Sequence, residues 1–232
     1  MRFVFPSAKA SPKGGVSSPE QWFEAPPAAH GIFSKICSSA VIPSERQRQG
    51  LAETTRMLVA LIHREAGDFN WLYDWIILRG YKEGAAAAVF TMLAKNELLV
   101  GFIGIDSRLP LEEEVPDAQR AETDILFRVG AVNHLRTVIG MNLIDTNCTP
   151  EEAREQLEHL NTPVFLECGS RQQRVSVALP HAIKNTFGMD LRREKKHWYH
   201  VLCPSQRYKP IYDFLTRKID LPYRSGLIPT RT

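Results

Sequence analysis

A chain of 232 residues, 44% of them hydrophobic, is long enough to bury one ample core, whereas two full domains would be cramped. Its 29 basic and 26 acidic residues give a formal net charge of +3, which is too balanced overall to indicate a nucleic-acid-binding protein. The four cysteines stand far apart with no C-x-x-C pair, so we expect neither a zinc site nor a disulfide framework, and no bound metal.

The first 30 residues are rich in Pro, Ser, Gly and Ala, which predicts a disordered, flexible arm over residues 1–30 and one domain over residues 31–232. No apolar stretch approaches the roughly 18 residues that span a bilayer, so we expect no membrane partner and a cytoplasmic location. An organellar signal stays open, since no acidic residue precedes Glu20.

A strand and two helices are predicted next along the chain. Ile32–Ile42 has strand character, and Pro43-Ser44-Glu45 introduces an amphipathic helix that Gly67 ends. A second helix is expected over Asn70–Lys82, with Gly80 and Gly84 marking its end.

Val89–Ile105 has the composition of two strands folded back on one another around Lys95-Asn96. Gly101 and Gly104 leave two positions of the second strand without a side chain, which suits close approach by another backbone or a ligand. We therefore predict a hairpin here.

In the second half, helices and strands alternate, which is typical of an α/β or α+β domain. Thr149 is a strong helix cap, because Pro follows it at the first helical position and two acids stand in the first turn. The predicted elements are a strand at Ile125–Val132, the helix from Thr149, a strand at Thr162–Cys168, a helix that Gly188 ends, a strand at Leu191–Leu202 and a basic helix at Tyr208–Lys218.

Three segments resemble the GNAT superfamily of acyl-CoA N-acyltransferases. They are the Val89–Ile105 hairpin with its Val-Gly-Phe run, the strand Pro163–Cys168, and the segment Ala182–Tyr199, in which a helix closes before a charged strand. The resemblance covers about Ala40 to Cys203. It implies a single GNAT-like domain, with a central mixed, mostly antiparallel sheet flanked by helices.

The resemblance also implies a loop that holds the pyrophosphate of acetyl-CoA on backbone N–H groups at a helix start. The best match is Arg136-Thr137-Val138-Ile139-Gly140-Met141, in which Ile139 and Met141 stand where the family has glycine and a small residue. Val129 would supply the backbone N–H for the oxyanion. Two alternatives stay open: residues 136–145 form a strand, and the helix start at Thr149 is the anion site.

For catalysis, the resemblance implies a base near the acceptor amine and an acid for the departing thiolate. Glu122 and Asp124 stand at the start of the strand where the amine would lie. The family's usual tyrosine is replaced by Lys184, so Tyr199 or Lys184 is the candidate acid.

The resulting hypothesis is an N-acyltransferase that transfers acetyl from acetyl-CoA to a small-molecule or peptide amine by direct attack. The rival is a non-catalytic GNAT-like or other α/β interaction module with a decayed cofactor site, which binds an acidic partner through its basic C-terminal face. Nucleic-acid binding through Leu191–Thr232 is a third hypothesis, although no recognisable nucleic-acid module supports it.

Overall fold

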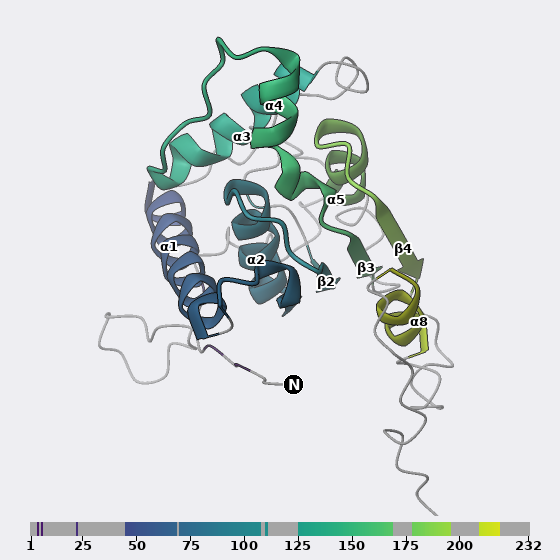
Figure 1. Cartoon of the computed structure of the whole chain (residues 1–232). Helices are drawn as coiled ribbons and strands as arrows, with labels where there is room; N and C mark the ends of the chain where they lie inside the picture. Colours follow the sequence, from purple (N-terminus) through teal and green to yellow (C-terminus); the bar gives the residue numbers. More distant parts are fainter. Residues whose placement is uncertain are drawn as a thin grey trace, which may run out of the picture.

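The computed structural model describes residues 4, 6, 22, 45–68, 70–107, 110, 125–168, 178–195 and 209–218 (Figure 1). Its strands are β1 (Ile77–Tyr81), β2 (Gly101–Ile105), β3 (Val164–Cys168) and β4 (Leu191–Lys195). Its helices are α1 (Glu45–Asp68), α2 (Glu83–Ala94), α3 (Ile125–Ile139), α4 (Pro150–Gln156), α5 (Ala178–His181) and α8 (Lys209–Lys218), with shorter helical turns at η2 (Tyr73–Trp75), η5 (Glu158–Asn161) and η7 (Ala182–Thr186).

The four strands form one sheet in the order β1-β2-β3-β4, and every neighbouring pair is parallel. Parallel neighbours need a crossover connection, and here the connections carry the helices. The expectation of a mixed, mostly antiparallel sheet is therefore wrong.

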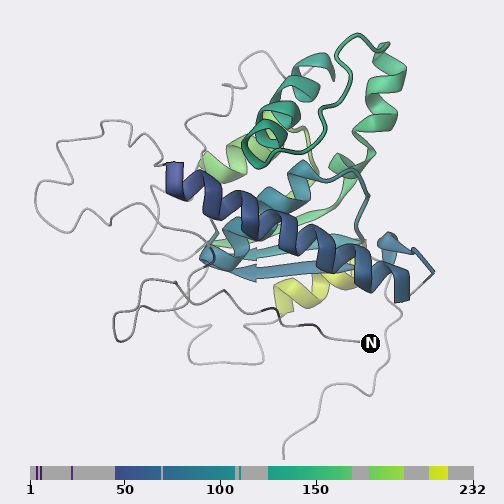
Figure 2. The same cartoon turned by 90° about the vertical axis from the view of Figure 1, so that its left-hand side faces the viewer.

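Side chains of the sheet alternate between two cores. Phe102, Val164 and Leu166 face α2 and α3, where most of the buried apolar side chains gather. Ile103 and Phe165 face the opposite side and pack against α8, and the rings of Phe165 and Phe214 lie 5.5 Å apart. Figure 2 shows α8 on the other side of the strands from α1 and α3.

The predicted helix over Asn70–Lys82 and the predicted hairpin over Val89–Ile105 are both wrong in type. The first segment contains η2 and then strand β1, and the first arm of the hairpin belongs to α2. All ten residues from Ala85 to Ala94 are buried, so α2 has no polar face to reveal a helical period in the sequence. Only the second arm, β2, is the predicted strand.

The predicted strand at Ile125–Val132 is the first half of α3. This helix ends at Ile139, and Gly140 follows with φ +67°, the left-handed conformation that glycine favours at a helix end. Residues 136–145 are therefore not a strand. Asn133 holds the next segment against α3, since its amide exchanges two hydrogen bonds with the backbone of Ile144 at 2.8 and 2.7 Å.

Several other predicted elements are confirmed. The amphipathic helix is α1, the buried strand predicted over Thr162–Cys168 is β3, and Gly188 ends its helix with φ +64°. Thr149 caps α4 with a complete capping box, in which the Glu152 N–H donates to Thr149 Oγ1 and the Thr149 N–H donates to Glu152 Oε2.

Some sequence predictions lie outside the described residues. These are the arm over residues 1–30 apart from Val4, Pro6 and Trp22, the strand Ile32–Ile42, and the part of the strand Leu191–Leu202 beyond Lys195. No helix in the described part of the chain is long and apolar enough to cross a membrane.

A buried polar network ties the turn after α2 to α3. Arg136 is 3% exposed, and its guanidinium donates to the Ala94 carbonyl at 2.9 Å and to the Asn96 side chain. Lys95 is 1% exposed and pairs with Glu97 at 3.1 Å. Burial lowers the pKa of Lys95. Burial alone would raise the pKa of Glu97, but the charge and hydrogen bond of Lys95, together with neighbouring groups, outweigh it. The pKa of Glu97 therefore lies below its usual value.

We predict that Arg136→Ala lowers the free energy of unfolding by about 3 kcal/mol, because it leaves buried carbonyls without a donor. Urea denaturation followed by circular dichroism measures this. The control is Arg154→Ala, which removes an exposed pair with Glu151 and should lower stability by less than about 1 kcal/mol. Equal losses in the two variants would contradict the structural role of Arg136.

His159 makes stability depend on pH. It is fully buried, its Nε2 lies 3.2 Å from the Leu93 carbonyl oxygen, and burial lowers its pKa from 6.5 to about 4. At pH values between these two pKa values, His159 is protonated in the unfolded chain and neutral in the folded chain. The free energy of unfolding is therefore highest above pH 6.5 and falls as the pH drops toward 4.

The expected loss between pH 7 and pH 4 is about 3 kcal/mol, since each unit of pKa difference corresponds to about 1.4 kcal/mol. Urea denaturation of the native chain and of His159→Gln across this range measures it. The variant removes the titrating group, so its stability should fall less steeply. Parallel pH dependence in the two proteins would show that His159 is not responsible.

Candidate functional site

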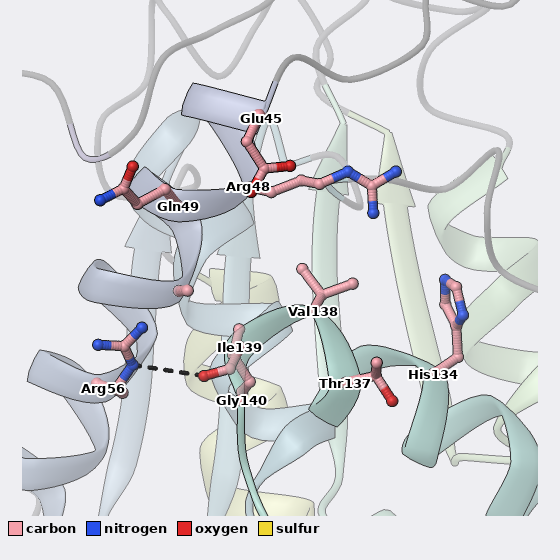
Figure 3. Close-up of a pocket in the computed structure, with 10 residues that line it drawn as sticks. Glu45, Arg48, Gln49, Arg56, His134, Thr137, Val138, Ile139 and Gly140 are labelled. Atoms are coloured by element: carbon pink, nitrogen blue, oxygen red, sulfur yellow. Dashed lines mark hydrogen bonds between the residues drawn. The ribbon is translucent and has the colours of Figure 1, made fainter.

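Two places in the described chain have the geometry of a functional site: the turn between β1 and α2, and a cavity between α1 and α3. Figure 3 shows the cavity, which has a volume of about 450 Å³. Arg48 extends from α1 toward the side of the cavity where His134 stands. The lining residues are Glu45, Arg48, Gln49, Ala52, Arg56, His134, Thr137, Val138, Ile139 and Gly140.

The cavity contains much of the predicted cofactor loop, but at the wrong end of a helix. Thr137, Val138, Ile139 and Gly140 form the last turn of α3 and the residue after it, where backbone carbonyls give a partial negative charge. Arg56 reinforces this assignment, because its Nε donates to the Ile139 carbonyl at 3.4 Å (Figure 3). The segment lacks the positive helix start that a pyrophosphate requires.

The other predicted site residues are not gathered at this cavity. Arg136 points into the protein and is occupied by carbonyl groups, and Met141 packs on the main core. Val129 is fully buried within α3 rather than on a strand. Glu122, Asp124 and Tyr199 lie outside the described residues.

The turn between β1 and α2 is built on a backbone contact. A Cβ added to Gly80 would lie 2.3 Å from Ala85 Cα and 2.5 Å from Ala85 N, so only glycine lets the end of β1 approach the first turn of α2 this closely. The chain reverses within three residues, from Tyr81 at the end of the strand to Glu83 at the start of the helix.

Lys82 lies at the apex of this turn with φ +49° and ψ −117°, a conformation that is rare for a residue with a side chain. Its N–H donates to the Ile105 carbonyl at 2.8 Å, and its carbonyl accepts from the Ala86 N–H at 2.9 Å. The side chain is exposed, and its Nζ lies 5.2 Å from the centre of the Tyr81 ring. The fold thus presents an ammonium group at the carboxyl edge of the sheet.

Three further groups belong to the same edge. A Cβ added to Gly84 would lie 3.2 Å from Trp22 Nε1, so the Trp22 indole lies against the start of α2. Asp106 follows β2 with φ +51°, and its N–H donates to the Glu167 carbonyl at 2.8 Å. Glu167 is 6% exposed, as expected for an acid within a hydrophobic strand, and its Oε1 accepts no hydrogen bond from a described residue.

No protein-family model matches the sequence, and no curated protein sequence matches it either. The structure resembles that of SOBER1 from Arabidopsis thaliana, with a TM-score of 0.56, 16% identity, and coverage of 93% of this chain and 83% of that chain. A single-residue variant of SOBER1 gives a TM-score of 0.57 at 17% identity, with the same coverage. The chain has the α/β-hydrolase fold.

This fold overturns the predictions that followed from the GNAT resemblance. The chain is not a GNAT-like acetyl-CoA N-acyltransferase with an amine acceptor, and neither acetyl-CoA nor the basic-face interaction module is supported. The three segments that carried the resemblance are the α2–β2 region, β3 and the η7–β4 region, and β2, β3 and β4 are parallel neighbours in one sheet. The local sequence similarity therefore did not indicate whether neighbouring strands run parallel or antiparallel.

In α/β-hydrolases, a sharp strand-to-helix turn of the form G-x-S-x-G presents the nucleophilic serine. Gly80-Tyr81-Lys82-Glu83-Gly84 has this spacing, this position between a strand and a helix, and the strained apex, but lysine replaces serine. The sequence contains the signal that would have found the site. The prediction that Gly80 and Gly84 mark a helix end is wrong, because Gly80 lies in β1 and Gly84 in α2.

We predict that Gly80→Ala lowers the free energy of unfolding by more than about 3 kcal/mol or prevents folding, because its Cβ overlaps the Ala85 backbone. The matched control is Gly130→Ala in the interior of α3, where an added Cβ meets no atom within 4 Å. That change should stabilise by about 0.5–1 kcal/mol, through helix propensity. Chemical denaturation measures both; a mild effect at Gly80 would contradict the close approach.

Proposed function

We propose that this chain is a non-hydrolytic member of the α/β-hydrolase architecture, in which the strand-to-helix turn binds an anionic ligand and does not cleave an ester. The observation that carries the proposal is Lys82 at the apex of the turn. Serine chemistry needs a hydroxyl that attacks the carbonyl and forms an ester that water can cleave. An amine at that position would form an amide instead, which ends turnover.

The chemistry of the turn favours a carboxylate as the ligand. The first backbone N–H groups of α2 have no acceptor within the helix, and the helix start carries a partial positive charge. Glu83 stands in the first turn and already benefits from this charge, so the exposed Lys82 ammonium is the cation available to a ligand. Trp22 and Tyr81 offer apolar surface beside it, which suits a carboxylate attached to a hydrocarbon group.

The first test is hydrolysis of p-nitrophenyl acetate and p-nitrophenyl butyrate, with labelling by a fluorophosphonate probe. The native chain should show no saturable turnover above that of Lys82→Ala, and no label between Gly80 and Gly84. Saturable turnover by the native chain would overturn the non-hydrolytic assignment, whether or not the Lys82→Ala variant retained it.

The second test is binding of acetate, butyrate and octanoate, followed by backbone amide shifts in NMR titrations. We expect shifts at Glu83 and Gly84, and a dissociation constant about tenfold larger in Lys82→Gln, since a lost charge-assisted contact is worth about 1.4 kcal/mol. Lys184→Gln removes another exposed lysine and should bind as the native chain does. Equal binding by both variants would place the ligand elsewhere.

The cytoplasmic location stays a prediction.

A further inference from the structure

The segment Asn70–Ile76, which joins α1 to β1, exposes an unusual amount of apolar side chain; we name it the tryptophan loop. Trp71 is 64% exposed, Leu72 is 40% exposed and Trp75 is 70% exposed. Two of the chain's four tryptophans therefore face solvent within five residues. Large aromatic side chains are normally well buried, and clustered exposure of this kind marks an interaction surface.

The loop holds these side chains outward by fixed contacts. Asn70 and Trp71 have φ of +57° and +64°, and the Trp71 N–H donates to the Ala66 carbonyl at 2.7 Å, which closes the end of α1. Tyr73, between the two tryptophans, turns inward instead. Its hydroxyl lies 2.6 Å from His63 Nδ1, and its ring lies 5.3 Å from Lys95 Nζ. The inward tyrosine anchors the loop, and the outward indoles remain uncovered.

The size of the surface decides between two kinds of partner. The two indoles and Leu72 expose on the order of 400 Å², because a large aromatic side chain carries up to about 250 Å². A stable protein interface buries about 800 Å² on each partner, so this surface is roughly half of what a second copy of the chain would need. A lipid bilayer needs no complementary surface, and tryptophan favours the boundary between its head groups and hydrocarbon.

The charges around the tryptophan loop agree with a lipid partner. Arg64, beside the loop on α1, is paired with Glu65 at 3.2 Å. The sequence next to the tryptophans also contains the acidic residues Asp68 and Asp74. The surroundings therefore carry no excess of positive charge that would attract anionic lipids, which favours a zwitterionic phospholipid as the partner. The loop precedes β1 and Lys82 follows it, so the two features lie at opposite ends of this strand. We propose that Trp71, Leu72 and Trp75 insert into the interfacial region of a phosphatidylcholine bilayer and attach the protein to the membrane surface.

The test is co-sedimentation of the full chain with phosphatidylcholine vesicles, together with quenching of tryptophan fluorescence by brominated phosphatidylcholine. We expect the native chain to bind and to be quenched, and Trp71→Ala/Trp75→Ala to partition at least tenfold more weakly. The matched control is Leu143→Ala, which removes an apolar side chain that is 58% exposed outside the tryptophan loop and should bind as the native chain does. Adding phosphatidylserine should not strengthen native binding, since the loop and its surroundings carry no excess of positive charge.

A second variant keeps the test decisive if the double variant is unstable. The Trp71 ring lies beside α1, since a Cβ added to Gly67 would be 3.8 Å from it, whereas Trp75 is the more exposed. Trp75→Ala alone should weaken partitioning by at least threefold without a change in the unfolding midpoint. The proposal would be overturned if the native chain did not bind the vesicles, or if the variants partitioned as strongly as the native chain. A dimer in light scattering that Trp75→Ala converts to a monomer would overturn it as well.

Discussion

The contact between Gly80 and Ala85 is the constraint on which the arrangement of β1 and α2 depends. A side chain at Gly80 would occupy the space of the helix backbone, so the strand and helix approach as closely as main chains allow. That approach places α2 flat on the sheet, where its residues from Ala85 to Ala94 are all buried. It also forces the strained reversal at Lys82, because only a sharp turn joins two elements this close together.

At Lys82 the backbone and the side chain have separate roles. The main chain of the turn is held by bonds to Ile105 and Ala86, and these bonds do not involve the lysine side chain. The Nζ contacts only the face of Tyr81 among the interactions found in the described residues. The architecture therefore presents whatever side chain stands at this position, and in the proposed function the lysine determines which ligands bind there.

The sequence correctly predicted helices that have either one polar and one buried face or a clear start signal. Helix α1 has a polar face, and α4 begins with a Thr149–Glu152 capping box, so the sequence shows each of them. Residues 85–94 of α2 are all buried, and so are Val129, Ala131 and Val132 of α3. A largely apolar run of this kind does not distinguish a buried helix from a strand. The strand predictions for residues 89–94, the second half of α2, and for Ile125–Val132 are wrong for this reason.

The candidate site was harder to predict, because its signal depended on knowing which element precedes it. Gly80 and Gly84 become a strand-to-helix turn only once Ile77–Tyr81 is known to be a strand, and that strand is short and half-exposed. Its neighbours Trp71 and Trp75 favoured a helical interpretation, since aromatic residues three and four apart are usually core. In the folded chain they are instead the most exposed of the large hydrophobic side chains that the structure describes.

The strand order β1-β2-β3-β4 is also the order of the strands along the chain. During synthesis, each described strand can therefore add to the edge that the previous strand provides, and within the described residues no strand has to insert between two others. The connection from β2 to β3, which includes α3 and α4, is by far the longest of the three. Closing it carries the largest loop entropy, so β1, α2 and β2 are expected to assemble on the ribosome before the second half of the sheet joins them.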